Sequence, residues 1–127
     1  MVVRVIRLGT PRAADEGLRI GTVRRPPRGV PKSEFAQRDW YDVWFPNLAP
    51  SVETMKQAQA ATTPAQWTAF TRRYRAEMAA PDNAHAIELL AALSRQTHFS
   101  VGCYCENEAH CHRSVLRALL AERGAKF

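Results

Sequence analysis

Three β-rich segments, separated by a long helical stretch, constrain the fold of this chain more than any other feature. Residues 2–8 and 18–23 are rich in Val, Ile and Leu, and residues 98–105 form a further mostly apolar run. Between residues 51 and 93 the apolar side chains recur every three or four positions, which is typical of helices. Strands at both ends with helices between them predict an α/β protein, a single small layered domain with a mostly parallel central sheet flanked by helices.

Four helices are expected. They are predicted from Ser51 to about Gln59, from Thr63 to just before Pro81, from Asp82 or Asn83 onward with Ile87, Leu90 and Leu93 inward, and over residues 107–123. Thr63 and Gln66 form a capping box with proline at the first helical position. Residues 33–44 fit either a short helix or a strand. The aromatic residues at 40–45 are expected in the core rather than stacked against nucleic-acid bases.

Length and apolar patterning limit the class of protein. A chain of 127 residues corresponds to one domain, 1–127, with a single core. No apolar stretch approaches the ~20 residues that cross a membrane, and the N-terminus lacks a secretory signal. We therefore expect a cytoplasmic protein with no membrane partner, in which the three cysteines stay reduced.

The net charge of +6 is unevenly distributed. Residues 1–38 carry nine Arg or Lys against three Asp or Glu, whereas the rest of the chain is balanced. Such an excess favours phosphate-bearing partners, either an anionic small molecule or a nucleic acid. Within this basic third, Arg25 and Arg28 flank two prolines in a stiff turn after the second strand, and they are candidate ligand-binding residues. A solvated turn is the alternative.

Reactive side chains are concentrated at a strand-to-helix turn, residues 103–113. This segment holds all three cysteines and two of the four histidines. Turns of this kind bind ligands in many α/β proteins, and a helix start attracts anions. The candidate catalytic residues, a reactive thiol with a proton carrier, are Cys105, Glu106, Cys111 and His112. Arg113 is the candidate that binds the anion.

Two other interpretations of this turn stay open. Cys103, Cys105 and Cys111, with His110 or His112, supply four soft ligands that suit zinc or iron, although the spacing C-x-C-x5-C-H is not that of a standard zinc finger. The second interpretation is a nucleic-acid-binding protein that uses charge alone, without enzymatic activity. Considered alone, Cys103 is better explained as a small buried side chain.

These motifs resemble the family called domain of unknown function 488, including its YeaO-like branch. The likeness is carried by Arg25-Pro26-Pro27-Arg28-Gly29, by Trp44 through Leu48-Ala49-Pro50-Ser51, by Trp67 through Met78, and by Cys105-Glu106 with Cys111-His112-Arg113. Where YeaO-like members read Asp-Arg-Leu-Trp-Pro-Arg-Gly, residues 23–29 here read Val-Arg-Arg-Pro-Pro-Arg-Gly, so no role of that acid or tryptophan is carried over. The resemblance implies a compact α/β domain and supports Cys105, Glu106, Cys111, His112, Arg113 and Arg28 as one site.

Together these observations predict one polar cleft formed by the 24–29 turn and the 103–113 turn. We expect it to bind a phosphate-bearing ligand, such as a nucleotide or nucleic acid, and to process it with the help of a thiol.

Overall fold

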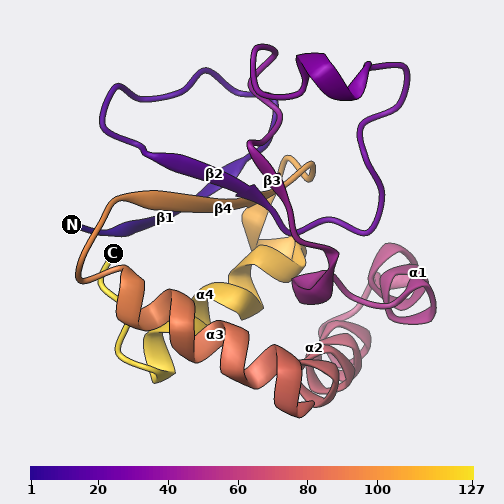
Figure 1. The fold of residues 1–127 in the computed structure, drawn as a ribbon. Helices are drawn as coiled ribbons and strands as arrows, with labels where there is room; N and C mark the ends of the chain where they lie inside the picture. Colours follow the sequence, from indigo (N-terminus) through magenta and orange to yellow (C-terminus); the bar gives the residue numbers. More distant parts are fainter.

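Four parallel strands form one sheet in the computed structural model, which describes residues 1–127 (Figure 1). The strands are β1 (Val3–Arg7), β2 (Leu18–Gly21), β3 (Val43–Trp44) and β4 (Phe99–Cys103), in the order β1-β4-β2-β3. Every residue of the central strand β4 is buried, which explains its mostly apolar sequence. The predicted α/β class with a parallel sheet is confirmed.

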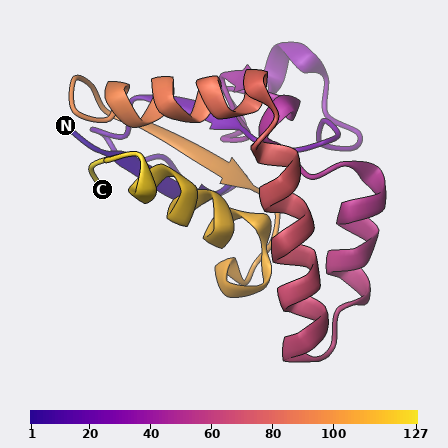
Figure 2. The ribbon, with the colours of Figure 1, turned by 90° about the horizontal axis from the view of Figure 1, so that it is seen from below.

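Four helices pack below the sheet in the view of Figure 1. They are α1 (Val52–Ala60), α2 (Pro64–Met78), α3 (Pro81–Leu93) and α4 (His112–Glu122). Seen from below, α3 and α4 lie in front of the sheet, whereas the irregular segments after β1 and β2 lie behind it (Figure 2). None of the four helices is both long enough and apolar enough to span a membrane.

The predicted starts of α1 and α2 are confirmed. The Ser51 hydroxyl accepts a hydrogen bond from the backbone N–H of Thr54, and the capping box of Thr63 and Gln66 is complete. The predicted start of α3 is wrong. This helix begins at Pro81 without a side-chain cap, and the Asn83 amide donates instead to the Glu77 carbonyl oxygen at 3.0 Å.

The prediction of one continuous helix over residues 107–123 is also wrong. Glu108–His110 form a separate 3-10 turn, which begins where the Asn107 side chain accepts from the backbone N–H of Ala109. Cys111 then adopts an extended backbone, with φ −130° and ψ 150°, and α4 starts only at the next residue. Local side-chain bonding by Asn107 competes with helix formation, which explains the break.

Two apolar clusters hold the layers together. The larger one lies between the sheet and the helices and includes Phe70, Tyr74, Val101 and Leu116. Leu93, expected to face inward, is instead 38% exposed. The smaller cluster lies at the carboxyl ends of the strands and consists of Leu8, Val23, Tyr41, Cys103 and Cys111. Two of the three cysteines are therefore part of the apolar packing at this edge of the sheet.

The segment 33–44 forms mostly turns. A 3-10 turn at Lys32–Glu34 is its only helical part, and β3 begins at Val43. Tyr41 is buried, as the core assignment of the aromatic residues predicts, whereas Trp44 is substantially exposed.

Candidate functional site

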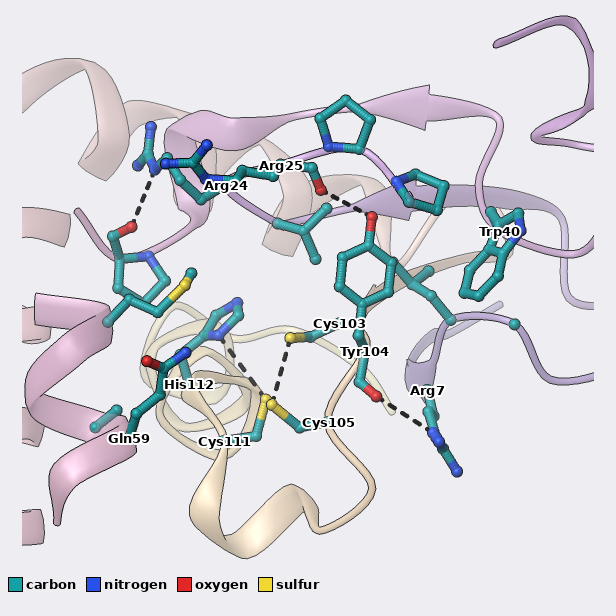
Figure 3. A pocket seen from close by; sticks show the side chains of 18 of the residues that line it. Arg7, Arg24, Arg25, Trp40, Gln59, Cys103, Tyr104, Cys105, Cys111 and His112 are labelled. Atoms are coloured by element: carbon teal, nitrogen blue, oxygen red, sulfur yellow. Dashed lines mark hydrogen bonds between the residues drawn. The ribbon is translucent and has the colours of Figure 1, made fainter. Parts of the chain in front are cut away.

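The sheet topology brings the two predicted turns to one edge of the sheet. β2 and β4 are neighbours and run in the same direction, so the segments that follow them leave the sheet at the same edge. The Tyr104 hydroxyl donates to the Arg25 carbonyl oxygen at 2.8 Å, which links the 103–113 turn directly to the 24–29 turn (Figure 3).

A cavity of about 770 Å³ lies between these turns. Its wall combines residues of both turns with Met55 and Gln59 of α1 and Phe70 of α2. Four arginines line the cavity, namely Arg7, Arg24, Arg25 and Arg28. No aspartate or glutamate is among the lining residues. The cavity therefore has a strongly positive lining.

The four arginines differ in how much of their hydrogen-bonding capacity is used. Arg24 donates to the carbonyl oxygens of Pro50 and Ala49 at 3.1 and 3.0 Å, so it holds the chain ahead of α1 in place. Arg7 donates to the Tyr104 carbonyl oxygen at 3.3 Å. The guanidinium groups of Arg25 and Arg28, by contrast, are exposed and make no hydrogen bond or ion pair within the protein.

Three thiols and one imidazole gather at the floor of the same cavity (Figure 3). Cys103 Sγ lies 3.7 Å from Cys105 Sγ, and Cys111 Sγ lies 3.8 Å from His112 Nδ1. The metal-ligating atoms of Cys103, Cys111 and His112 are all within 4.8 Å of one another. Cys103 and Cys111 are buried, whereas Cys105 is exposed, and all three cysteines are free thiols.

A backbone carbonyl fixes the orientation of the His112 ring. His112 Nε2 lies 2.7 Å from the Thr22 carbonyl oxygen. Because a carbonyl oxygen only accepts, Nε2 must carry a proton. In the neutral imidazole this leaves the lone pair on Nδ1, the nitrogen that faces Cys111.

The three thiols do not share the same acidity. Hydrogen bonds from the thiols of Cys103 and Cys105 lower the pKa of Cys111, and the hydrogen bond with His112 lowers it further. The pKa of Cys103 is raised because its thiol proton is held by the neighbouring sulfurs in a buried position. For Cys105, the hydrogen bond with Cys103 lowers the pKa, but the bond with Cys111 and burial outweigh it and the pKa is raised overall.

Arg113 lies behind the cluster rather than in the cavity. Its side chain is buried, at 3% exposure, and Nη2 donates to the Cys105 carbonyl oxygen at 2.6 Å. It forms no ion pair with a carboxylate, and its Nε has no hydrogen-bond partner. The bond to the Cys105 carbonyl holds the guanidinium next to Cys105, and its positive charge lowers the pKa of that thiol.

The remaining predicted site residues lie further from the sulfur cluster. Glu106 is exposed, does not line the cavity and lies 3.6 Å from Arg7. His110 lines the cavity, but its ring packs edge-on against Trp67 at 5.6 Å and is not part of the cluster.

Several cavity residues are not recognisable as site residues in the sequence. The positions of Arg7 and Tyr104 in the cavity depend on the strand register, which pairs Arg7 with Cys103. This register cannot be inferred before the strand order is known. Met55 and Gln59 carry no recognisable chemical signal. Trp40, assigned to the core, lines the cavity and packs edge-on against Tyr104 at 5.7 Å.

Comparison with known proteins agrees with the resemblance of these motifs. Residues 3–124 match the family model DUF488-N3a, described as the active DUF488-N3 subclade. No curated protein and no solved structure matches the chain. Since the family model spans nearly the whole sequence, including both turns that line the cavity, the chain belongs to the DUF488 family.

Proposed function

We propose that the cavity binds a phosphate-bearing ligand, a nucleotide or a nucleic-acid strand. The observation that carries this proposal is the lining of four arginines without a single carboxylate. Arg25 and Arg28 have no partner within the protein, so their guanidinium forks are available for bidentate contacts with phosphate oxygens.

The aromatic wall of the cavity supports a ligand that carries a base. Trp40 and Tyr104 lie beside the arginines, and both line the cavity. Base–aromatic stacking and contacts between arginine and phosphate together are the usual means of binding single strands and nucleotides. Phosphate alone would need only the arginines.

We further propose that the bound ligand is processed at the floor of the cavity, where Cys105, Cys111 and His112 lie. This part of the proposal is supported by the shared cavity, which holds the arginines and the sulfur cluster together. The description of the matching subclade as active is in keeping with it. Arg113 then acts as a positioning residue through the Cys105 carbonyl, and Glu106 positions Arg7 from the solvent side.

Competition binding tests the proposal directly. A fluorescein-labelled single-stranded oligonucleotide is titrated with the protein, and fluorescence anisotropy reports binding. Unlabelled ATP and inorganic pyrophosphate should displace the probe, whereas adenosine should not, because the arginines contact phosphate. Competition by adenosine that equals that of ATP, or no effect of pyrophosphate, would contradict phosphate recognition.

Replacement of cysteine separates processing from binding by charge. A protein that only binds through charge should lose affinity steeply with salt and should tolerate Cys105→Ser and Cys111→Ser without loss of function. If these variants bind the oligonucleotide normally but no longer alter it, the cluster takes part in processing. If neither the wild type nor the variants alter the oligonucleotide and all bind it equally, the binding-only alternative is favoured.

A further inference from the structure

We infer that Cys103, Cys105, Cys111 and His112 bind one zinc ion at the floor of the cavity. This zinc site lies in the cavity described above, but it does not depend on which ligand the arginines bind. Three observations support it: the spacing of the ligand atoms, the orientation of His112, and the uncompensated charge of Arg113.

Two ligand–ligand distances match a tetrahedral thiolate site. Zn–S bonds of about 2.3 Å place two sulfur ligands of a tetrahedron about 3.8 Å apart, and a sulfur and an imidazole nitrogen about 3.5 Å apart. Cys103 and Cys105 have their sulfur atoms 3.7 Å apart, and the Cys111 sulfur lies 3.8 Å from His112 Nδ1. The other contacts among Cys103, Cys111 and His112 lie within 4.8 Å, close enough for side-chain rotation to complete the tetrahedron.

The local backbone explains how neighbouring residues reach one centre. Cys103 is the last residue of the central strand β4, and His112 is the first residue of α4. Cys111 has an extended backbone instead of a helical one, so its side chain and that of His112 meet at 3.8 Å. The two regular elements therefore fix Cys103 and His112, Cys111 occupies the N-cap position of α4, and Cys105 closes the site from the exposed loop.

The ring of His112 is oriented as metal-ligating histidines usually are. One ring nitrogen, Nε2, donates to the Thr22 carbonyl oxygen at 2.7 Å, and the other presents its lone pair to the sulfur atoms. A hydrogen bond from the distal nitrogen to a carbonyl is the common outer-shell contact of zinc-bound histidine, since it sets the tautomer and the ring plane. His110 in the same loop makes no such contact with the cluster.

The charge of Arg113 suits an anionic centre at the sulfur cluster, which a zinc–thiolate site provides. A buried arginine without a carboxylate partner is costly unless another anion compensates it. Zn²⁺ with three thiolates and one neutral imidazole carries a net charge of −1. Arg113, which donates to the Cys105 carbonyl oxygen at 2.6 Å, supplies the positive charge that neutralises it.

Metal analysis of the whole protein tests the inference. Untagged protein is purified without chelator, and zinc and iron per chain are measured by elemental analysis. Protein stripped with chelator is then titrated with Zn²⁺ alone. About one zinc per chain is expected in one or both preparations, and the three thiols should react with a thiol reagent only after the metal is removed. Well-folded protein that holds no zinc before or after reconstitution, or that holds iron instead, would overturn the assignment.

Variants locate the site. Cys103→Ser, Cys111→Ser and His112→Asn should abolish stoichiometric zinc, and Cys105→Ser should weaken binding less, because Cys105 is the exposed ligand. His110→Asn is the matched control and should keep zinc unchanged. Zinc retained by Cys111→Ser and His112→Asn would refute the ligand set.

A spectroscopic readout keeps the test independent of whether the variants fold. Co²⁺ added to the stripped wild-type protein should give the visible absorption and the sulfur-to-cobalt charge-transfer band of a tetrahedral thiolate complex. A spectrum without sulfur ligation would contradict the inference. Failure of these metal tests, with the anion competition still as expected, would remove the zinc site and leave the proposed ligand binding intact.

Discussion

His112 donates through Nε2 to the carbonyl oxygen of Thr22 at 2.7 Å, and this bond joins the start of α4 to the end of β2 across 90 residues of sequence. Thr22 is itself fixed, because its N–H and its hydroxyl both donate to the Gly102 carbonyl oxygen at 3.0 Å. The sheet thus sets the plane of the imidazole that faces the sulfur cluster. The site is oriented by the central strands rather than by the loop that carries most of its residues.

Loss of the His112 ring should destabilise the protein. In His112→Ala the Thr22 carbonyl oxygen loses its side-chain donor in a buried position, which costs about 1–3 kcal/mol of unfolding free energy. Urea denaturation with a chelator present measures the difference without a contribution from metal. His110→Ala, which alters an exposed side chain in the same cavity, should change stability by less than about 0.5 kcal/mol. Equal losses in the two variants would contradict the anchoring role.

Two glycines with the same backbone conformation should respond differently to alanine. Gly17 and Gly29 have φ of +77° and +71°, so alanine costs about 1 kcal/mol of backbone strain at either position. At Gly17 an added Cβ would also lie 2.0 Å from the His98 carbonyl oxygen, whereas nothing lies within 4 Å at Gly29.

Gly17→Ala should therefore lower the urea midpoint much more than Gly29→Ala, by several kcal/mol in unfolding free energy as against about one. The backbone at His98 belongs to the approach to β4, so the clash cannot be relieved by a side-chain rotation. Similar stabilities of the two variants would show that residues 15–18 pack differently.

The buried ion pair of Glu16 and Arg19 should make stability depend on pH. Arg19 is fully buried and donates to both Glu16 carboxylate oxygens, at 2.7 and 2.9 Å. Burial raises the pKa of Glu16, but the hydrogen bonds from Arg19 and Ser100 outweigh it, and the pKa is lowered overall. The pair therefore stabilises the folded state above the unfolded-state pKa, about 4.3, and this contribution is lost as the pH falls through the folded-state pKa.

Glu16→Gln removes the charge with little change of shape. It should cost about 3–5 kcal/mol at pH 7, because Arg19 is left buried and uncompensated. The difference between wild type and variant should shrink as the pH is lowered from 5 toward 3. Glu77, whose pKa is also lowered, titrates in both proteins and cancels in the comparison. A difference that is constant with pH would mean that the charge of Glu16 contributes nothing.

The α/β class, the parallel sheet and the starts of α1 and α2 were predictable because they depend on local signals. The apolar composition of the strands, the Ser51 cap and the capping box of Thr63 are each recognisable within a few residues. The break at Cys111 was not predictable. It results from a side-chain bond of Asn107 and from packing of Cys111 against Leu8 and Val23, contacts that no sequence period reveals.

The candidate site was predictable in part, because several of its residues lie close together in the sequence. Clustering of Cys103, Cys105, Cys111 and His112 along the chain pointed to the turn, and the structure places these four side chains together. Arg113 was expected to contact the ligand. Its neighbour His112 points to the cavity. Because successive residues of a helix differ by about 100° in direction, the Arg113 side chain lies behind the cluster. The direction of a side chain at a helix start depends on the residue at which the helix begins. The sequence does not define that residue to within several positions.

We expect the positive charges of the cavity, rather than the overall charge of the protein, to bind the phosphate-bearing ligand. Arg25→Gln/Arg28→Gln removes two charges from the cavity, and Arg72→Gln/Arg73→Gln removes two exposed charges of α2 that do not line it. The dissociation constant of the labelled oligonucleotide, measured at one salt concentration for both double variants, compares them directly.

The cavity variant should bind at least about tenfold more weakly, since a hydrogen bond to a charged group contributes about 1.5–3 kcal/mol. The α2 variant should stay within about twofold of the wild type, because screened surface charges contribute little. Equal weakening in both variants would contradict the claim and would mean that overall charge, not this cavity, attracts the ligand.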